Sequence, residues 1–305
     1  MSITTAEFRS KITTHILAEK KLQAERITAL TAYDYSTARL VDEAGVDVIL
    51  VGDSLAQTML GYESTLPVTM EEMLHHTRAV RRAVKRAFLI TDMPFGSYHV
   101  SPQESLANAV RLVKEGGAEA VKIEGGEKRI GLIREILDAE IPVCGHIGLT
   151  PQSVHKMGGY KVQGKTLPAI EELMRDAAAL DRAGVCLLVL EGIPREVAAM
   201  ITAEVEAPTI GIGAGPECDG QILVFHDLVN LTSMAPAKFV RRYADAGALI
   251  GDAVREYCKD VKAGTFPAEG ESYHLAKDSQ AALAMAAGGR AESGKRVASG
   301  GVSKR

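Results

Sequence analysis

The stretch "DVILVGDSLAQTM" (residues 47–59) runs from an apolar segment into an acid and a hydroxyl, Asp53 and Ser54. Short apolar runs rich in Val and Ile are typical of strands that are buried on both faces of a parallel sheet. A buried carboxylate is costly unless it is paired. Asp53 is therefore either a turn residue that follows the strand or a residue that holds something positive.

The same pattern of an apolar run followed by a helix-like stretch repeats along the chain, which favours βαβ units and a parallel sheet. Eight such units predict a (β/α)8 TIM barrel, an α/β fold, with a doubly wound sheet as the alternative. The connection between the last two expected strands is short and loop-like, so we expect that unit to be irregular. The expected strands are residues 26–34, 47–54, 88–95, 120–126, 142–150, 186–193, 207–215 and 221–229.

Helix starts support this division of the chain. Thr69 begins the capping-box pattern T-M-E-E, and Pro102 follows Ser101 at a first helical position. Residues 236–263 form a long helix-like stretch.

Two segments are expected to lie outside the barrel. Residues 1–25 are predicted to form an N-terminal helical leader, and residues 26–275 the catalytic barrel domain. Residues 276–305 are rich in Gly, Ala and Ser and are predicted to be a disordered tail.

Composition excludes several classes of protein. The 305 residues carry a net charge of −4, which disfavours an extended basic face for nucleic acid. No apolar run reaches the roughly 18 residues that span a bilayer, and charges interrupt the N-terminal stretch where a secretory signal would lie. Four scattered cysteines give no disulfide framework. We expect a cytoplasmic protein with neither nucleic acid nor membrane as a partner.

Residues that can carry chemistry recur at the expected strand ends, where the active site of a (β/α)8 barrel lies. Four carboxylates at one barrel mouth repel one another unless a cation lies among them. No His pair or Cys set accompanies them, and oxygen ligands favour Mg²⁺ or Mn²⁺ over Zn²⁺. The residues concerned are Asp53, Ser54, Asp92, Lys122, Glu124, His146 and Glu191.

Each of these residues also has a simpler interpretation when it is taken alone. An Asp at a strand end is commonly a turn residue or a helix cap. Lys122 and Glu124 face the same way on a strand and could form a local ion pair. His146 could be a hydrogen-bonded core residue, and Glu191 could cap the following helix. The conjunction at one barrel mouth is what favours a functional site.

Several long motifs in this chain resemble those of the ketopantoate hydroxymethyltransferase family, in the family's order, from about residue 3 to residue 275. Asn230 departs from the pattern, because the family usually has Gly after "HDL". The matching stretches include "LTAYDYSTARLVDEAGVDVILVGDSLAQTMLGYESTLPVTMEEM" (30–73), "DMPFGSY" (92–98), "VKIEGG" (121–126), "GHIGLTPQSV" (145–154), "GGYKVQGKT" (158–166), "LEGIP" (190–194) and "GIGAGPECDGQILVFHDL" (211–228).

The resemblance implies an enzyme of pantothenate and coenzyme A biosynthesis. With Mg²⁺ it would transfer a hydroxymethyl group from 5,10-methylenetetrahydrofolate to 3-methyl-2-oxobutanoate, giving 2-dehydropantoate and tetrahydrofolate. Members of this family are cytoplasmic in bacteria and commonly homodecameric. The two nearest alternatives are a Mg²⁺-dependent carbon–carbon lyase or phosphoenolpyruvate-mutase-like enzyme that acts on a 2-oxoacid, and a non-catalytic barrel. The lyases typically carry a cysteine motif that is not evident here, and a non-catalytic barrel would be expected to have lost an acid or the lysine.

The resemblance also assigns roles residue by residue. Glu191 matches the catalytic proton acceptor, and His146 is a possible positioning group for the substrate or a water. The metal site matches Asp53, Asp92 and Glu124, and the 2-oxoacid contacts match Asp53, Ser54, Asp92 and Lys122.

Overall fold

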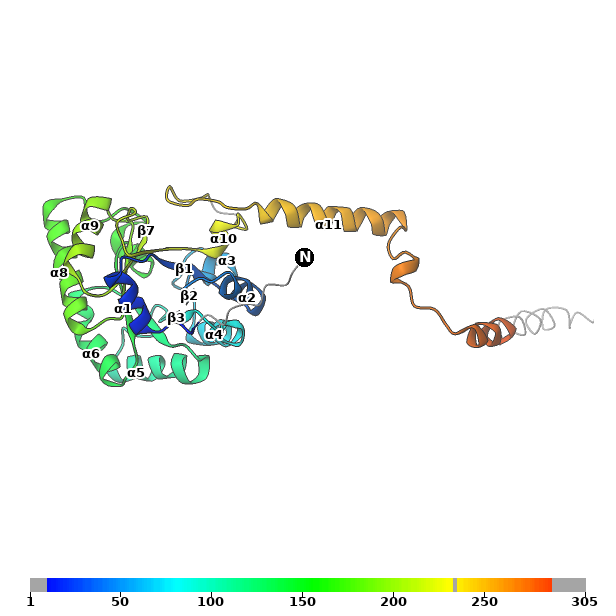
Figure 1. The fold of residues 1–305 in the computed structure, drawn as a ribbon, viewed down its shortest axis with the longest axis horizontal. Helices are drawn as coiled ribbons and strands as arrows, with labels where there is room; N and C mark the ends of the chain where they lie inside the picture. The colour runs from blue at the N-terminus through cyan, green and yellow to red at the C-terminus, as the bar shows by residue number, and fades with distance from the viewer. Residues whose placement is uncertain (1–9, 233–234, 287–305) are drawn as a thin grey trace, which may run out of the picture. The chain divides into compact units, whose positions relative to one another are not determined.

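Residues 27–223 contain a closed barrel of eight parallel strands. Helices surround this barrel in Figure 1. The computed structural model describes residues 10–232 and 235–286. The strands follow one another around the barrel in chain order, and β8 pairs with β1. All eight predicted strands are present, although the eighth is wrong in its second half, because residues 225–228 form a helix. The closed barrel excludes the doubly wound alternative. The strands are β1 (Ile27–Thr31), β2 (Val48–Val51), β3 (Phe88–Asp92), β4 (Ala120–Glu124), β5 (Val143–Gly148), β6 (Leu187–Glu191), β7 (Thr209–Ile212) and β8 (Gly220–Leu223).

Helices connect most of the strands, and their starts agree with the sequence signals. The Thr69 capping box is formed, and Pro102 occupies the first turn of its helix. Residues 213–219 join β7 to β8 without a helix, which confirms the predicted irregular unit. The α-helices are α1 (Thr14–Leu22), α2 (Tyr35–Glu43), α3 (Leu55–Thr58), α4 (Met70–Ala83), α5 (Pro102–Arg111), α6 (Ile130–Asp138), α7 (Val154–Met157), α8 (Leu167–Ala183), α9 (Arg195–Glu204), α10 (Phe225–Leu228) and α11 (Ala246–Ala263). Shorter turns of 3₁₀- or π-helix are η1 (Leu112–Gly116), η2 (Glu127–Arg129), η3 (Pro151–Ser153) and η4 (Glu269–Glu271).

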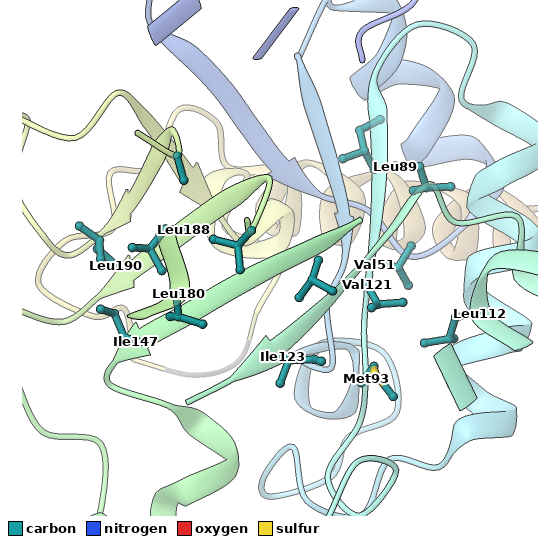
Figure 2. Packing of buried hydrophobic residues seen from close by; sticks show 14 of the residues in the cluster. Val51, Leu89, Met93, Leu112, Val121, Ile123, Ile147, Leu180, Leu188 and Leu190 are labelled. Atoms are coloured by element: carbon teal, nitrogen blue, oxygen red, sulfur yellow. The ribbon is translucent and has the colours of Figure 1, made fainter. Parts of the chain in front are cut away.

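Alternate strand residues divide the core into two layers. One set faces outward and packs under the helices, as Val51, Leu89, Val121 and Leu188 do in Figure 2. The other set fills the barrel interior and includes Phe88 and Ile90 of β3. Because side chains alternate along a strand, the next inward positions of β3 to β6 lie at the carboxyl end of the barrel.

The predicted leader is helical where α1 covers residues 14–22, and residues 1–9 lie outside the described part. The predicted helix over 236–263 is wrong at its start, because the helix begins only at residue 246. Residues 235–245 are not helical, and backbone hydrogen bonds join the end of this segment to residues 228 and 229. Tyr243 N–H donates to Leu228 O and Ala246 N–H donates to Val229 O, each at 2.8 Å. This tertiary pairing overrides the local helical pattern.

The chain divides into two compact units, residues 1–247 and 248–305. In the second unit, residues 277–286 are helical, which differs from the disorder predicted for this part of the tail. The stretch is rich in Ala, Leu and Met, which have high helix propensity. Residues 287–305 lie outside the described part of the chain, and the domain boundaries at 25 and 275 stay predictions.

Asn230, the cysteines and the helix lengths can each be compared with what the sequence predicted. Asn230, where the family usually has Gly, has a φ of 53°, and this left-handed region suits Gly best and tolerates Asn. The four cysteines are free, in line with the prediction of no disulfide framework. Among the described residues, no helix is both long enough and apolar enough to cross a bilayer.

Candidate active site

The predicted site residues converge on one cavity at the carboxyl end of the barrel. The cavity has a volume of about 880 Å³. Asp92, Lys122, Glu124, His146 and Glu191 continue the inward-facing positions of β3 to β6. All seven predicted residues, from Asp53 and Ser54 directly after β2 to Glu191 at the end of β6, line this cavity. The structure therefore brings together the whole predicted set.

Asp53 and Asp92 are held against each other by the backbone. Asp53 follows β2 in a turn, and its N–H donates to Asp92 Oδ2 at 2.9 Å. A Cβ on the preceding Gly52 would lie 2.8 Å from Ser54 Oγ and 3.5 Å from Asp92 Oδ2, so a larger residue there would crowd two residues of the site. Both residues are buried: Asp53 is 4% exposed and Asp92 is 3% exposed.

Lys122 and His146 link the acids of neighbouring strands. Lys122 Nζ lies 3.2 Å from Asp92 Oδ1 and 3.0 Å from His146 Nδ1. Because an ammonium can only donate, Nδ1 accepts, and the ring proton of a neutral His146 is then on Nε2. That Nε2 lies 3.2 Å from Glu191 Oε2, although without hydrogen-bond geometry. A lysine, a histidine and a glutamate thus form a row that crosses β4, β5 and β6.

The buried charges at this end of the barrel are unbalanced. Burial, reinforced by Asp92 and Glu124, raises the pKa of Asp53 well above its usual value. Burial lowers the pKa of Lys122, but its attraction to Asp92 and Glu124 more than reverses this, so that pKa is raised. Lys122 therefore stays an ammonium, and one ammonium faces three buried carboxylates. Such a set is stabilised by a further cation.

These residues fit a hard divalent cation. Asp92 Oδ1 is buried and lies 3.2 Å from Lys122 Nζ, but it has no partner with hydrogen-bond geometry, so it keeps a lone pair for a further cation. The donors are all carboxylate oxygens, the ligand type that Mg²⁺ prefers. Within residues 10–232 and 235–286, no three His, Cys, Asp or Glu side chains already stand in a metal-binding cluster. Mg²⁺ does not require one, since it is commonly held by one or two carboxylates together with substrate oxygens and waters.

Three further residues contact the predicted site residues or their partners, and none of the three was predicted from the sequence. Tyr33 lies with its hydroxyl oxygen 2.8 Å from Ser54 Oγ. Gln152, in η3 directly after β5, donates from Nε2 to Asp53 Oδ2 at 2.9 Å, and Tyr98 donates to Gln152 Oε1 at 2.5 Å. Gln152 could have been suspected from its place after a strand end. Nothing local in the sequence signals the contacts of the two tyrosines.

The outer part of the cavity differs in character from its floor. Tyr160 and Phe239 line it as half-exposed aromatic side chains, and Lys161 and Lys238 add exposed ammonium groups. Phe239 lies against the backbone of Gly213, where a Cβ would come within 2.6 Å of its ring. The cavity therefore joins an acidic, metal-compatible floor to a wider rim that is aromatic and basic.

Comparison with known proteins gives consistent results over nearly the whole chain. Residues 11–269 match the family model described as ketopantoate hydroxymethyltransferase. A relative from Koribacter versatilis, named 3-methyl-2-oxobutanoate hydroxymethyltransferase, is 73% identical over 93% of this chain and 97% of its own. A relative of the same name from Thermoanaerobacter sp. (strain X514) is 54% identical over 88% of this chain and 97% of its own.

Solved structures agree on the fold. A 2,3-dimethylmalate lyase, described as a member of the PEP mutase/isocitrate lyase superfamily, is 19% identical, with a TM-score of 0.54 over 94% of this chain and 98% of its own. A phosphonopyruvate hydrolase, solved in complex with oxalate and Mg²⁺, is 15% identical, with a TM-score of 0.55 over 90% of this chain and 97% of its own. At these identities the likeness concerns the barrel alone. The family model and the close relatives go further, and the chain belongs to the ketopantoate hydroxymethyltransferase family of enzymes.

Proposed function

We propose that this cavity transfers a hydroxymethyl group from 5,10-methylenetetrahydrofolate to 3-methyl-2-oxobutanoate, with Mg²⁺ as cofactor, giving 2-dehydropantoate and tetrahydrofolate. Membership of the family supports the reaction class. The observation that carries the proposal is the convergence of three buried carboxylates, one buried ammonium and Glu191 on one end of the cavity. A 2-oxoacid needs such a set, because its reaction requires a cation for the oxoacid and a base for carbon 3.

Asp53 and Asp92 would hold the Mg²⁺, with Glu124 in the surrounding shell. The assignment is supported by the surplus negative charge of these carboxylates and by Asp92 Oδ1, which is ion-paired with Lys122 but has no hydrogen-bond partner. When bound, Mg²⁺ supplies a Lewis acid that polarises the keto group of the oxoacid.

Lys122 and Ser54 would bind the oxoacid. The Lys122 ammonium is buried and carries three donors, so it can pair with the substrate carboxylate or with the negative charge that develops on the keto oxygen. Ser54 can donate its hydroxyl while Tyr33, 2.8 Å away, donates to the serine oxygen. The two donors approach from β2 and β4 and would fix the orientation of a planar oxoacid.

Glu191 would act as the general base. It removes the proton from carbon 3, and the electron pair of that C–H bond shifts toward the keto group. Carbon 3 then forms a bond to the one-carbon unit, whose bonds to the folate nitrogens break with the electron pairs leaving on nitrogen, and a water supplies the hydroxyl of the product. His146 Nε2 lies 3.2 Å from Glu191 Oε2, and a small rotation of either side chain would let it donate to the carboxylate and keep it aimed at the substrate. A base placed in this way is worth about 10²–10⁴-fold in rate.

The rim of the cavity suits the folate. Tyr160 and Phe239 offer aromatic faces for a flat ring system, and Lys161 and Lys238 offer charges for the carboxylates of its tail. A cavity of about 880 Å³ lies within the range for ligand pockets of this size class, roughly 300–1,000 Å³.

We also propose that the enzyme acts in the cytoplasm as a homo-oligomer, with the decamer of the family as the expected form. Helix α11 supports assembly, because none of its residues is buried. Ile250, Val254, Tyr257 and Val261 recur along it at helical spacing and are between 45% and 56% exposed. Exposed apolar stripes of this kind mark protein interfaces.

The test is product analysis. The purified protein is incubated with 3-methyl-2-oxobutanoate, Mg²⁺ and 5,10-methylenetetrahydrofolate, and the products are identified by mass. Formation of 2-dehydropantoate that depends on both the folate and Mg²⁺ is the expected result. Cleavage of a 2-oxoacid without folate would point to the lyase alternative, and no reaction of either kind would contradict the proposal.

A further inference from the structure

Gln152 contacts groups that follow or end three neighbouring strands. Its side-chain Nε2 donates to Asp53 Oδ2 at 2.9 Å, beyond β2, and to Met93 O at 3.0 Å, directly after β3. Its backbone N–H donates to Glu124 Oε2 at 3.0 Å, at the end of β4. The residue is only 5% exposed. One glutamine after β5 therefore cross-links the part of the barrel mouth that carries two of the proposed Mg²⁺ carboxylates.

The orientation of the Gln152 amide is determined by its neighbours. The carbonyl of Met93 can only accept, so the NH₂ group must face it and Oε1 must face away. Tyr98 then donates its hydroxyl to Oε1 at 2.5 Å. Burial raises the pKa of Tyr98, so this hydroxyl keeps its proton. Both N–H groups and the carbonyl of the amide are engaged, and a flipped amide would lose the bonds to Met93 and Asp53, because both of those partners are acceptors.

This arrangement orients carboxylates without neutralising them. An amide donates to Asp53 but adds no positive charge, whereas a lysine or arginine there would compete with a bound cation. Glu124 is fixed in the same way through the Gln152 backbone N–H, while its other oxygen lies 3.6 Å from His146 Nδ1. Partners of this kind, which hold metal-ligating carboxylates in place, commonly affect metal affinity.

We propose that Gln152 is a positioning residue of the proposed Mg²⁺ site, and that Tyr98 fixes the amide in its working orientation. Gln152 acts through Asp53 and Glu124 and does not itself touch substrate. The inference rests on the proposed function, because it takes those two carboxylates as the groups that serve the cation.

The test measures Mn²⁺ affinity by electron paramagnetic resonance in the absence of both substrates. Gln152→Met keeps the side-chain length and removes the amide, and we expect it to weaken Mn²⁺ binding by about 10–100-fold. Tyr98→Phe removes a single hydroxyl and should weaken it in the same direction by a smaller factor. With saturating oxoacid, the Mg²⁺ concentration for half-maximal rate should rise in both variants.

The matched control is Thr77→Val, which also removes a buried polar group. Thr77 Oγ1 donates to Met73 O at 2.6 Å and lies 3.1 Å from Thr91 Oγ1, on the outward face of β3. It should lower the melting temperature yet leave Mn²⁺ affinity within about twofold, which separates lost stability from lost positioning.

Unchanged Mn²⁺ affinity in folded Gln152→Met would overturn the inference. If that variant does not fold, Tyr98→Phe decides, and unchanged affinity there would overturn it equally. Failure of the proposed function looks different, since wild-type protein would then bind no Mn²⁺, or would bind it as well after Asp92→Ala.

Discussion

Replacing Lys122 by Met should destabilise the protein strongly, because it removes the one ammonium that faces three buried carboxylates. Met is close to the lysine stem in length and volume, so packing along the stem is kept and the change is mainly one of charge. Lys122 and Asp92 have side chains that are only 5% and 4% exposed. Water can therefore do little to replace the lost partner.

The size of the effect follows from the geometry. At the 3.2 Å between Lys122 Nζ and Asp92 Oδ1, two unit charges attract by about 5 kcal/mol at an effective dielectric constant of about 20. Breaking a buried pair by removing one partner costs about 3–5 kcal/mol. For a domain of this size, each kcal/mol lowers the melting temperature by about 2–4 °C. We expect a loss of about 3–5 kcal/mol in the free energy of unfolding and a fall of roughly 6–20 °C.

The assay is urea unfolding followed by circular dichroism, in metal-free buffer and again with saturating Mg²⁺. Mg²⁺ should restore more stability to Lys122→Met than to the wild type, because the added cation replaces the missing charge. The control is Lys11→Met, since Lys11 pairs with Glu119 at 2.5 Å but the two side chains are 31% and 28% exposed. Exposed pairs are worth about 0–1 kcal/mol, and this partly exposed pair, which water can screen, should contribute far less than the buried Lys122–Asp92 pair. A Lys122→Met loss no larger than that of the control would refute this account of the buried charges.

Two further changes test other parts of the account. Asp92→Ala should abolish Mg²⁺ binding that is detectable by calorimetry. It should also lower turnover at least 100-fold, since losing one group that stabilises charge in the reaction costs on the order of that factor. Near-normal turnover would contradict the metal assignment. Deletion of residues 276–305 should leave kcat and KM unchanged in a steady-state assay, because the described residues of that tail are all exposed; a collapse of activity would show that the tail is part of the working structure.

The barrel and most of its site follow from short-range patterns. Asp92 repeats the inward positions of Phe88 and Ile90, and Glu124 repeats those of Ala120 and Lys122, so periodicity alone places these side chains at the mouth. Strand order also follows, because each helix returns the chain to a neighbouring parallel strand.

Long-range contacts were beyond the reach of such patterns. Val51 faces outward, and strand alternation would make Asp53, two residues later, face outward as well. Asp53 reaches the site because β2 ends at Val51 and the chain then turns. Gln152 binds Asp53 across 99 positions of sequence, a contact that no local propensity encodes. Residues 236–245 have a helix-like composition but pair instead with the backbone near Leu228. In each case tertiary packing, and not local preference, determines the conformation.

The most direct test of the central claim is proton exchange at carbon 3 of the oxoacid. The protein is incubated with 3-methyl-2-oxobutanoate and Mg²⁺ in D₂O without folate, and the carbon-3 proton is followed by NMR. We predict metal-dependent exchange in the wild type and a loss of about 10²–10⁴-fold in Glu191→Gln, which keeps the shape of the side chain but not its basicity. Exchange at the wild-type rate in Glu191→Gln, or no exchange in the wild type, would contradict the proposed mechanism.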